Sequence, residues 1–242
     1  MTVSSKKTAI AQAHPSPSGT QAAAILHFYK TLRPDFVLPD GISVMNPYED
    51  ATSWQLASSF YEKFYSDTQP RVFIFGINPG RFGGGITGVP FTDPIRLQEK
   101  CGIPNEWKKQ AELSSIFIYE MIDGYGGVAA FYERFFITAL SPLGFTRDGK
   151  NLNYYDDKEL LRSSEPYMVE CIRRQLDTMP TLSTCCCLGE GENYKQFLRL
   201  NEKYGFFKEI IPLPHPRWVM QYRRKKIGEY VGVYVEKLNK II

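Results

Sequence analysis

The feature that most restricts the fold of this chain is a set of four short apolar runs, each followed by turn residues. They span residues 71 to 76, 135 to 140, 184 to 189 and 207 to 213. Runs that are apolar on both faces are typical of strands in a parallel sheet covered by helices. Patterns with helical spacing separate them, at about 112 to 122, 155 to 179 and 192 to 204. This alternation predicts an α/β fold, a three-layer α/β/α sandwich around a central four-stranded parallel sheet.

Further helical patterns flank these runs. They lie at about 20 to 32, about 50 to 65 and about 223 to 240, the last with apolar side chains at Ile227, Tyr230, Val231, Tyr234 and Leu238. Residues 1 to 19 are rich in Ser, Lys, Ala and Pro and lack periodicity, so we expect a disordered tail. A length of 242 residues with 43% hydrophobic residues fits one domain over 20 to 242.

The sequence gives no sign of a membrane or of an oxidising compartment. No run approaches the roughly 18 apolar residues of a membrane span, and the first residues lack the apolar core of a signal peptide. Three of the five cysteines are adjacent, Cys185 to Cys187, and neighbouring strand positions point to opposite faces. The triplet therefore cannot converge on one metal, and we expect buried free thiols, no metal, no cofactor and a cytoplasmic location.

The charge of the chain is informative only through its distribution. The net charge is +3, which is too small to indicate a nucleic-acid partner. Residues 205 to 242 carry eight basic and three acidic residues, and the basic ones concentrate in the run Arg223, Arg224, Lys225 and Lys226. Taken alone, this run fits a solvated helix start as well as a set of phosphate contacts.

Ligands of such a sheet bind beyond the carboxyl ends of its strands, which directs attention to the loops at 77 to 92, 141 to 154, 190 to 192 and 214 to 222. The first loop belongs to the segment 76 to 91, which contains six glycines. It has neither the Gly-Lys-Ser/Thr of a phosphate loop nor the spacing of a dinucleotide fingerprint. Composition alone leaves a plain glycine-rich connector open.

The order of residues in this segment is more specific. Asn-Pro-Gly at 78 to 80, followed by Thr-Gly-Val-Pro-Phe at 87 to 91, resembles the first motif of the single-strand-selective monofunctional uracil-DNA glycosylase family. The resemblance implies that Asn78 holds the hydrolytic water and that Phe91 stacks on the extruded base. It also implies that Ile77 and Gly80 supply backbone contacts to that base.

The segment 213 to 218, Leu-Pro-His-Pro-Arg-Trp, resembles the second motif of the same family. His215 would donate a hydrogen bond to O2 of the departing base, stabilising charge that develops in the transition state. The family has His-Pro-Ser-Pro-Arg, so this chain is two residues shorter before Arg217. The expected wedge into the base stack is Arg217, Trp218, Val219 and Met220, and the expected phosphate contacts are Arg223, Arg224 and Lys225. A His-Pro-Ser-Pro string at 14 to 17 precedes every core element and is interpreted as coincidence.

The base-reading segment departs further from the family. Residues 137 to 145 align with it, but Ala139 stands where the family has an asparagine that bonds the Watson–Crick edge of uracil. Ser141, a predicted base contact, or Thr138 would replace that amide only in part. We therefore predict broader specificity, including xanthine or 5-substituted uracils.

The acidic residues give no clear catalytic pair. The segment after the third strand, from Leu188, resembles the superfamily's strand-to-helix turn and is expected to cap a helix. Its Glu190 and Glu192 are not an obvious acid and base pair, and Asp93 and Asp123 lie outside the motifs. Without a carboxylate beside Asn78 the water is positioned rather than deprotonated, which predicts modest turnover. No lysine lies in a motif, so we expect hydrolysis without a Schiff base.

The resemblance implies a monofunctional DNA glycosylase of base excision repair that hydrolyses the N-glycosidic bond of uracil or a related base. Its partner would be single-stranded DNA, with duplex DNA left open, and we expect a monomer. Because of Ala139 and the shortened loop at His215, one alternative interpretation stays open. It is a non-catalytic DNA- or nucleotide-binding module with the same fold.

Overall fold

The computed structural model describes residues 19–242. The predicted disordered tail and the His-Pro-Ser-Pro string at 14 to 17 lie outside these residues, apart from Gly19. No helix in the described part of the chain has the length and apolar character needed to cross a bilayer.

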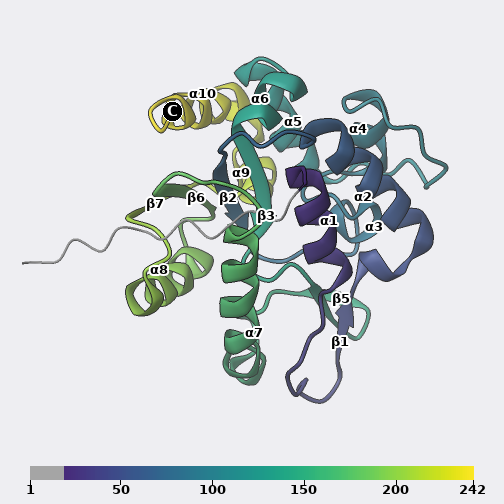
Figure 1. The fold of residues 1–242 in the computed structure, drawn as a ribbon, viewed down its shortest axis with the longest axis vertical. Helices are drawn as coiled ribbons and strands as arrows, with labels where there is room; N and C mark the ends of the chain where they lie inside the picture. The colour runs from purple at the N-terminus through teal and green to yellow at the C-terminus, as the bar shows by residue number, and fades with distance from the viewer. Residues whose placement is uncertain (1–18) are drawn as a thin grey trace, which may run out of the picture.

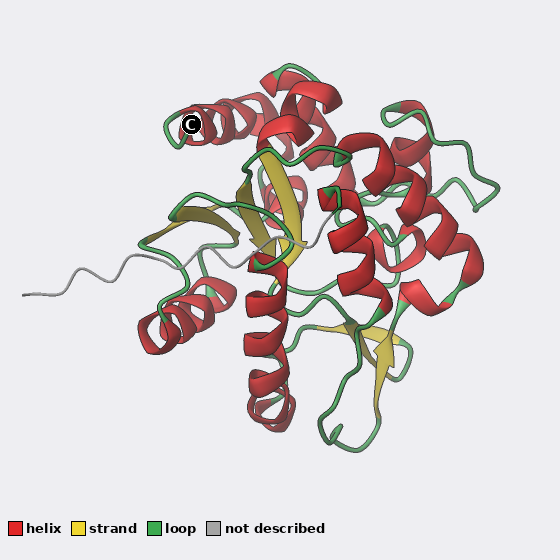
Figure 2. Ribbon diagram, viewed as in Figure 1, coloured by secondary structure: helices red, strands yellow, loops and turns green. Residues whose placement is uncertain are grey.

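The centre of the molecule is a four-stranded parallel sheet with strand order β3-β2-β6-β7 (Figures 1 and 2). The strands are β2 (Val72–Gly76), β3 (Phe135–Ala139), β6 (Thr184–Leu188) and β7 (Glu209–Leu213). Each lies in one of the four apolar runs. The predicted fold class is confirmed, because the four strands pair in parallel and helices cover both faces of the sheet.

Helices cover the two faces of the sheet and form the outer layers. One face carries α1 (Gln21–Lys30), α2 (Ala51–Phe64), α7 (Lys158–Leu176) and α8 (Glu192–Tyr204). The other carries α5 (Leu113–Tyr125), α9 (Pro216–Tyr222) and α10 (Ile227–Asn239), and α6 (Val128–Arg134) runs directly into β3. Neighbouring residues of β3 show the division. Phe136 packs on Tyr61 of α2, whereas Phe135 stacks on Phe131 of α6.

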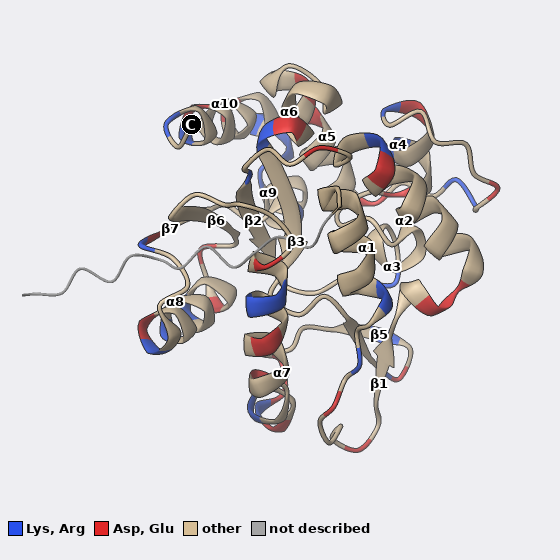
Figure 3. Cartoon of the chain, viewed as in Figure 1, with Lys and Arg blue, Asp and Glu red and all other residues tan. Residues whose placement is uncertain are grey.

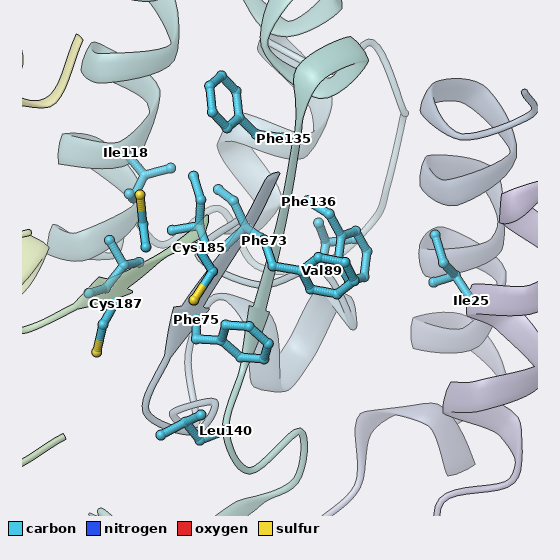
Figure 4. Packing of buried hydrophobic residues seen from close by; sticks show 14 of the residues in the cluster. Ile25, Phe73, Phe75, Val89, Ile118, Phe135, Phe136, Leu140, Cys185 and Cys187 are labelled. Atoms are coloured by element: carbon cyan, nitrogen blue, oxygen red, sulfur yellow. The ribbon is translucent and has the colours of Figure 1, made fainter. Parts of the chain in front are cut away.

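The strand side chains form the core in both directions (Figure 4). Cys187 faces α8, where its sulfur accepts a hydrogen bond from Asn193, and Cys185 points the same way along the strand. Cys186 lies on the opposite face. All three thiols are buried and free, and burial raises the pKa of Cys186 to about 12. Charged residues lie on the helices and loops around this core (Figure 3).

A second, antiparallel sheet was not predicted. Its order is β1-β4-β5, from β1 (Ile42–Met45), β4 (Gly144–Arg147) and β5 (Lys150–Leu152). These strands are short and partly exposed, and their sequences contain no continuous apolar run. The pattern that reveals the central strands is therefore absent from them. The remaining short elements are η1 (Pro47–Glu49), α3 (Gly84–Thr87), α4 (Pro94–Glu99) and η2 (Arg224–Lys226).

The segment 214 to 222, predicted as a loop, is largely the helix α9. His215 is its N-cap and Pro216 its first residue, a position where proline favours a helix start. Val219 and Met220 are buried, and the helix packs closely against α5. The last helix also begins later than predicted, at Ile227, because η2 occupies residues 224 to 226.

Candidate active site

A cavity of about 1030 Å³ opens at the carboxyl ends of the central strands. Its wall combines the glycine-rich segment after β2, the end of β3, the turn after β6 and the start of α9. The structure brings most of the predicted site residues to this wall: Ile77, Asn78, Gly80, Phe91, His215, Arg217 and Trp218. Residues separated by more than 130 positions in the chain therefore share one cavity.

The side-chain amide of Asn78 is held by the end of β5 and the turn that follows it. Its Nδ2 donates to the carbonyl oxygen of Leu152 at 3.1 Å, and its Oδ1 accepts from the N–H of Tyr154 at 3.0 Å. These two bonds fix which end of the amide is oxygen. The second lone pair of Oδ1 remains able to accept a hydrogen bond from a water molecule.

The same strand holds the glycine-rich segment through Asn151 of β5. Its Oδ1 accepts from the backbone N–H of Arg81 at 2.9 Å. A Cβ at Gly80 would lie 2.9 Å from Asn151 Nδ2, so the two segments are in close contact. Sequence analysis did not identify Asn151, Leu152 or Tyr154, since β5 is short and polar and the main contacts use backbone atoms.

Phe91 forms part of the wall next to β2. Its backbone has φ of 53°, in the left-handed region that few large residues adopt. A Cβ at Gly76 would lie 2.8 Å from Cε2 of the Phe91 ring, so only glycine leaves room for the ring at the end of β2. The ring centroid is 6.4 Å from that of His215.

His215 presents a defined tautomer to the cavity. Its Nδ1 accepts a hydrogen bond from the N–H of Arg217 at 3.2 Å. Burial, with a smaller effect of the Arg217 charge, lowers the pKa of His215 to about 4. The neutral ring therefore carries its proton on Nε2 near neutral pH, and Nε2 is a hydrogen-bond donor.

The end of β3 contributes no side-chain amide to the cavity wall. Ala139 lines it, and Thr138 lines it too, with its hydroxyl bonded to Gln175. Ser141 does not belong to the lining: it is buried, and its hydroxyl donates to the carbonyl oxygen of Leu143 at 2.8 Å. The expected contact between Ser141 and a base is therefore not formed by this arrangement.

Three carboxylates line the cavity, and one of them was not identified from the sequence. Glu112 is the N-cap of α5, and burial raises its pKa despite hydrogen bonds from the N–H groups of Ser114 and Ser115. Glu190 and Glu192 lie at the start of α8, whose N-cap is Gly191. The segment after β6 therefore begins a helix as expected, with Glu192 in its first turn. The described hydrogen bonds of Asn78 go to backbone atoms and include none of these carboxylates.

The remaining two acidic candidates have structural roles. Asp93 is buried and caps α4 through the N–H of Arg96 at 2.9 Å. Asp123 pairs with Lys100 at 2.6 Å on the surface. Neither residue lines the cavity.

Comparison with known proteins agrees with this geometry. The model of the uracil DNA glycosylase superfamily matches residues 62–239. The chain belongs to that superfamily. The crystal structure of wild-type SMUG2 from Pedobacter heparinus is similar, with a TM-score of 0.89 and 43% sequence identity over 91% of this chain and 97% of that chain. None of the curated proteins matches.

Membership of this superfamily makes the protein a monofunctional DNA N-glycosylase, a hydrolase of base excision repair. The family predicted from the two motifs is confirmed. The superfamily match begins within α2, so α1, η1 and β1 lie outside it.

Two of the four residues predicted to form the wedge are not at the rim of the cavity. Val219 and Met220 are buried in α9 and do not reach the surface. Trp218 is 38% exposed and Tyr222 is 65% exposed, and both line the cavity. The guanidinium of Arg223 lies 4.9 Å from the Trp218 ring centroid. Arg224 and Lys225 are exposed in η2, outside the lining.

Proposed function

We propose that this glycosylase hydrolyses the bond between the sugar and an extruded base with Asn78 and His215 as its catalytic residues. The observation that carries the proposal is the fixed orientation of Asn78, which lines the same cavity as His215 and whose Oδ1 accepts one described hydrogen bond, leaving a second lone pair for a water. Asn78 would hold a water near C1′ of the sugar. The water oxygen bonds to C1′ while the glycosidic electron pair leaves with the base.

The departing base takes up negative charge, and His215 would lower its energy. Neutral His215 has its proton on Nε2. It can therefore donate to O2 of the base while its Nδ1 still accepts from the N–H of Arg217. The proton released by the water ends on the base. Phe91 would stack on the base and hold it during cleavage.

We infer that the enzyme extrudes its target base from the DNA strand, since a stacked base cannot reach this cavity. Arg–aromatic pairs at the cavity would support the flanking strand. The Arg81 guanidinium lies 5.2 Å from the Phe82 ring centroid, and Arg223 lies 4.9 Å from Trp218. Both rings are partly exposed, which suits stacking of unpaired bases and favours single-stranded DNA.

We further propose that the enzyme accepts lesions beyond uracil, including xanthine or 5-substituted uracils. Ala139 provides no amide to pair with the edge of uracil, and Ser141 does not replace it. Stringency arises when a wrong ligand leaves buried polar groups unpaired. A cavity wall with fewer polar groups facing the base discriminates less between uracil and other bases.

The experiment is base excision from matched single-stranded oligonucleotides containing uracil, xanthine, hypoxanthine or hydroxymethyluracil, followed by alkaline cleavage. The wild-type enzyme should excise uracil and at least one other lesion, and the Asn78→Ala/His215→Ala enzyme should be inactive. A fully active double variant would overturn the assignment of these residues. Cleavage of uracil alone would overturn the broader specificity.

The domain organisation, the oligomeric state and the location of the protein can also be proposed. We propose that residues 20–242 form one domain, since side chains of α1 and α2 belong to the same core as the central sheet. We also propose that the protein is a monomer and that it is cytoplasmic. The five free thiols support the second proposal, since they fit a reducing compartment.

A further inference from the structure

Three exposed side chains line the cavity from elements other than α9. Arg81 and Phe82 belong to the glycine-rich segment after β2, and Lys150 is the first residue of β5. Phe82 is 40% exposed and does not belong to the hydrophobic core or to the side chains packed against it. Its ring contacts the Arg81 guanidinium at 5.2 Å, so most of its apolar surface remains available to a ligand.

The backbone on both sides of Phe82 is in close contact with neighbouring elements. Before it, the N–H of Arg81 donates to Oδ1 of Asn151 at 2.9 Å. After it, Gly83 has φ of 62°, and a Cβ there would lie 3.1 Å from Oε2 of Glu112. The exposed ring is therefore carried by a segment that is anchored at both ends.

The two cations of this group have no acidic partner among the described residues. Neither Arg81 nor Lys150 takes part in a salt bridge, and Asp148 in the adjacent turn forms none with them. A Cβ at Gly149 would lie 4.0 Å from Nη1 of Arg81, so the guanidinium lies beside the turn that leads into Lys150. Two free cations thus accompany one exposed ring.

An exposed aromatic ring with unpaired cations is the arrangement that binds a nucleotide of a single strand. The ring stacks on the base, and the cations attract the phosphate. The opposite charge lines the cavity at the start of α8, where Glu190 and Glu192 would repel a phosphate. The charges therefore favour a strand that runs past Phe82 rather than past α8.

We propose that Arg81, Phe82 and Lys150 form a binding subsite for one nucleotide next to the extruded one, with its base stacked on Phe82 and its phosphate held by the two cations. The inference rests on the proposed function and adds a second contact with the strand besides α9. The subsite is tolerant of sequence, because every base has a face that can stack.

The first test measures affinity by fluorescence anisotropy with a short single strand that contains one 2′-fluoro-2′-deoxyuridine. The fluorine destabilises positive charge on the sugar, so the base stays attached during the titration. Phe82→Ala should weaken binding about five- to hundredfold, the usual value of one base stacked on an aromatic ring, and Phe82→Tyr should bind nearly as wild type. The control is Val37→Ala, since Val37 is 83% exposed but does not line the cavity, and it should leave the affinity unchanged. Wild-type affinity in Phe82→Ala would overturn the subsite.

The second test removes the stacked base instead of the ring. Two further strands carry an abasic tetrahydrofuran in place of the base on the 5′ or the 3′ side of the fluorinated nucleotide. On one of them the wild type should lose about as much affinity as Phe82→Ala loses on the intact strand, and Phe82→Ala should lose nothing more. An equal effect of Phe82→Ala on all three strands would overturn stacking as the role of the ring.

The third test concerns the cations. Arg81→Ala/Lys150→Ala should reduce the slope of log affinity against log salt by about 1.4, or about 0.7 for each lost phosphate contact. Arg134→Ala/Lys208→Ala removes the same charge from exposed residues near the amino ends of β3 and β7 and should leave the slope nearly unchanged. Equal slopes of the two double variants would overturn the phosphate contact. A wild-type enzyme that excises no lesion would overturn the proposed function, while the affinities would still decide whether the subsite exists.

Discussion

The backbone N–H of Tyr154 donates to Oδ1 of Asn78 over 3.0 Å, so the turn that follows the small antiparallel sheet orients the proposed water-binding residue. The amide is held at both ends, since its Nδ2 also donates to the carbonyl oxygen of Leu152. In Asn78→Ala the water loses its acceptor while the fold keeps its core. We expect kcat to fall about 10² to 10⁴-fold, the usual range for such a group. Single-turnover excision of uracil measures it, and an unchanged melting temperature would exclude unfolding as the cause.

Asn151 is expected to act as a positioning residue. Its Oδ1 fixes the N–H of Arg81, next to the glycine that packs against it. Asn151→Ala should lower kcat about tenfold with a smaller change in KM, because one hydrogen bond that aligns the Asn78 segment is lost. Asn151→Asp keeps the acceptor oxygen and should restore most of kcat. Failure of the aspartate to restore more activity than the alanine would contradict this role.

His215 should also give the protein a characteristic pH dependence of stability. Its folded pKa of about 4 lies below its ordinary value of 6.5, so the unfolded chain binds a proton that the folded protein does not bind. The free energy of unfolding should therefore decrease as the pH falls from about 6.5 to about 4. Protonation of Nδ1 would also break the bond to the Arg217 N–H that caps α9.

The control for this prediction is His215→Asn, because asparagine is a good N-cap that does not titrate. Thermal unfolding of both proteins from pH 7 to pH 4 should show a smaller loss of stability in the variant. Parallel curves would contradict the assignment of the pH dependence to His215.

The central sheet and the loops that contain the proposed catalytic pair were predictable for a physical reason. Strands buried on both faces require continuous apolar runs, so β2 and β6 are visible in the sequence. The rule that ligands bind at the carboxyl ends of parallel strands then directed attention to the loops at 77 to 92 and 214 to 222, and the resemblance of their motifs to the glycosylase family singled out Asn78 and His215. Both residues follow strands of the sheet.

The support of the site was not predictable in the same way. Asn78 is held by backbone atoms of Leu152 and Tyr154, and backbone atoms leave no signature in residue type. The helix α9 has only seven residues, which is too short for a clear apolar period.

We expect Trp218 to be a side chain that fills the space left by an extruded base. It is exposed at the cavity and backed by the T-shaped contact with Tyr230, whereas Val219 and Met220 are buried. Trp218→Ala should reduce excision from duplex DNA more than from single strands, since only a duplex leaves a stack to fill. Trp218→Phe keeps an aromatic ring and should recover part of the duplex activity. Equal losses on the two substrates would argue against a wedge.

The basic run beside α9 should contribute to DNA affinity through charge alone. Arg223, Arg224 and Lys225 are exposed next to the cavity rim. Each phosphate contact that is lost should reduce the slope of log affinity against log salt by about 0.7 on single strands, or about 2 for all three. Replacing all three with alanine should produce this change in fluorescence anisotropy titrations at several salt concentrations.

The matched control replaces Arg134, Lys208 and Lys240 with alanine. These exposed residues lie near the amino ends of the central strands, at the edge opposite the cavity, and their loss removes the same charge. Their replacement should leave the salt slope nearly unchanged. If the two triple variants weaken binding equally, the run next to α9 is a solvated helix start and the phosphates are bound elsewhere on the surface.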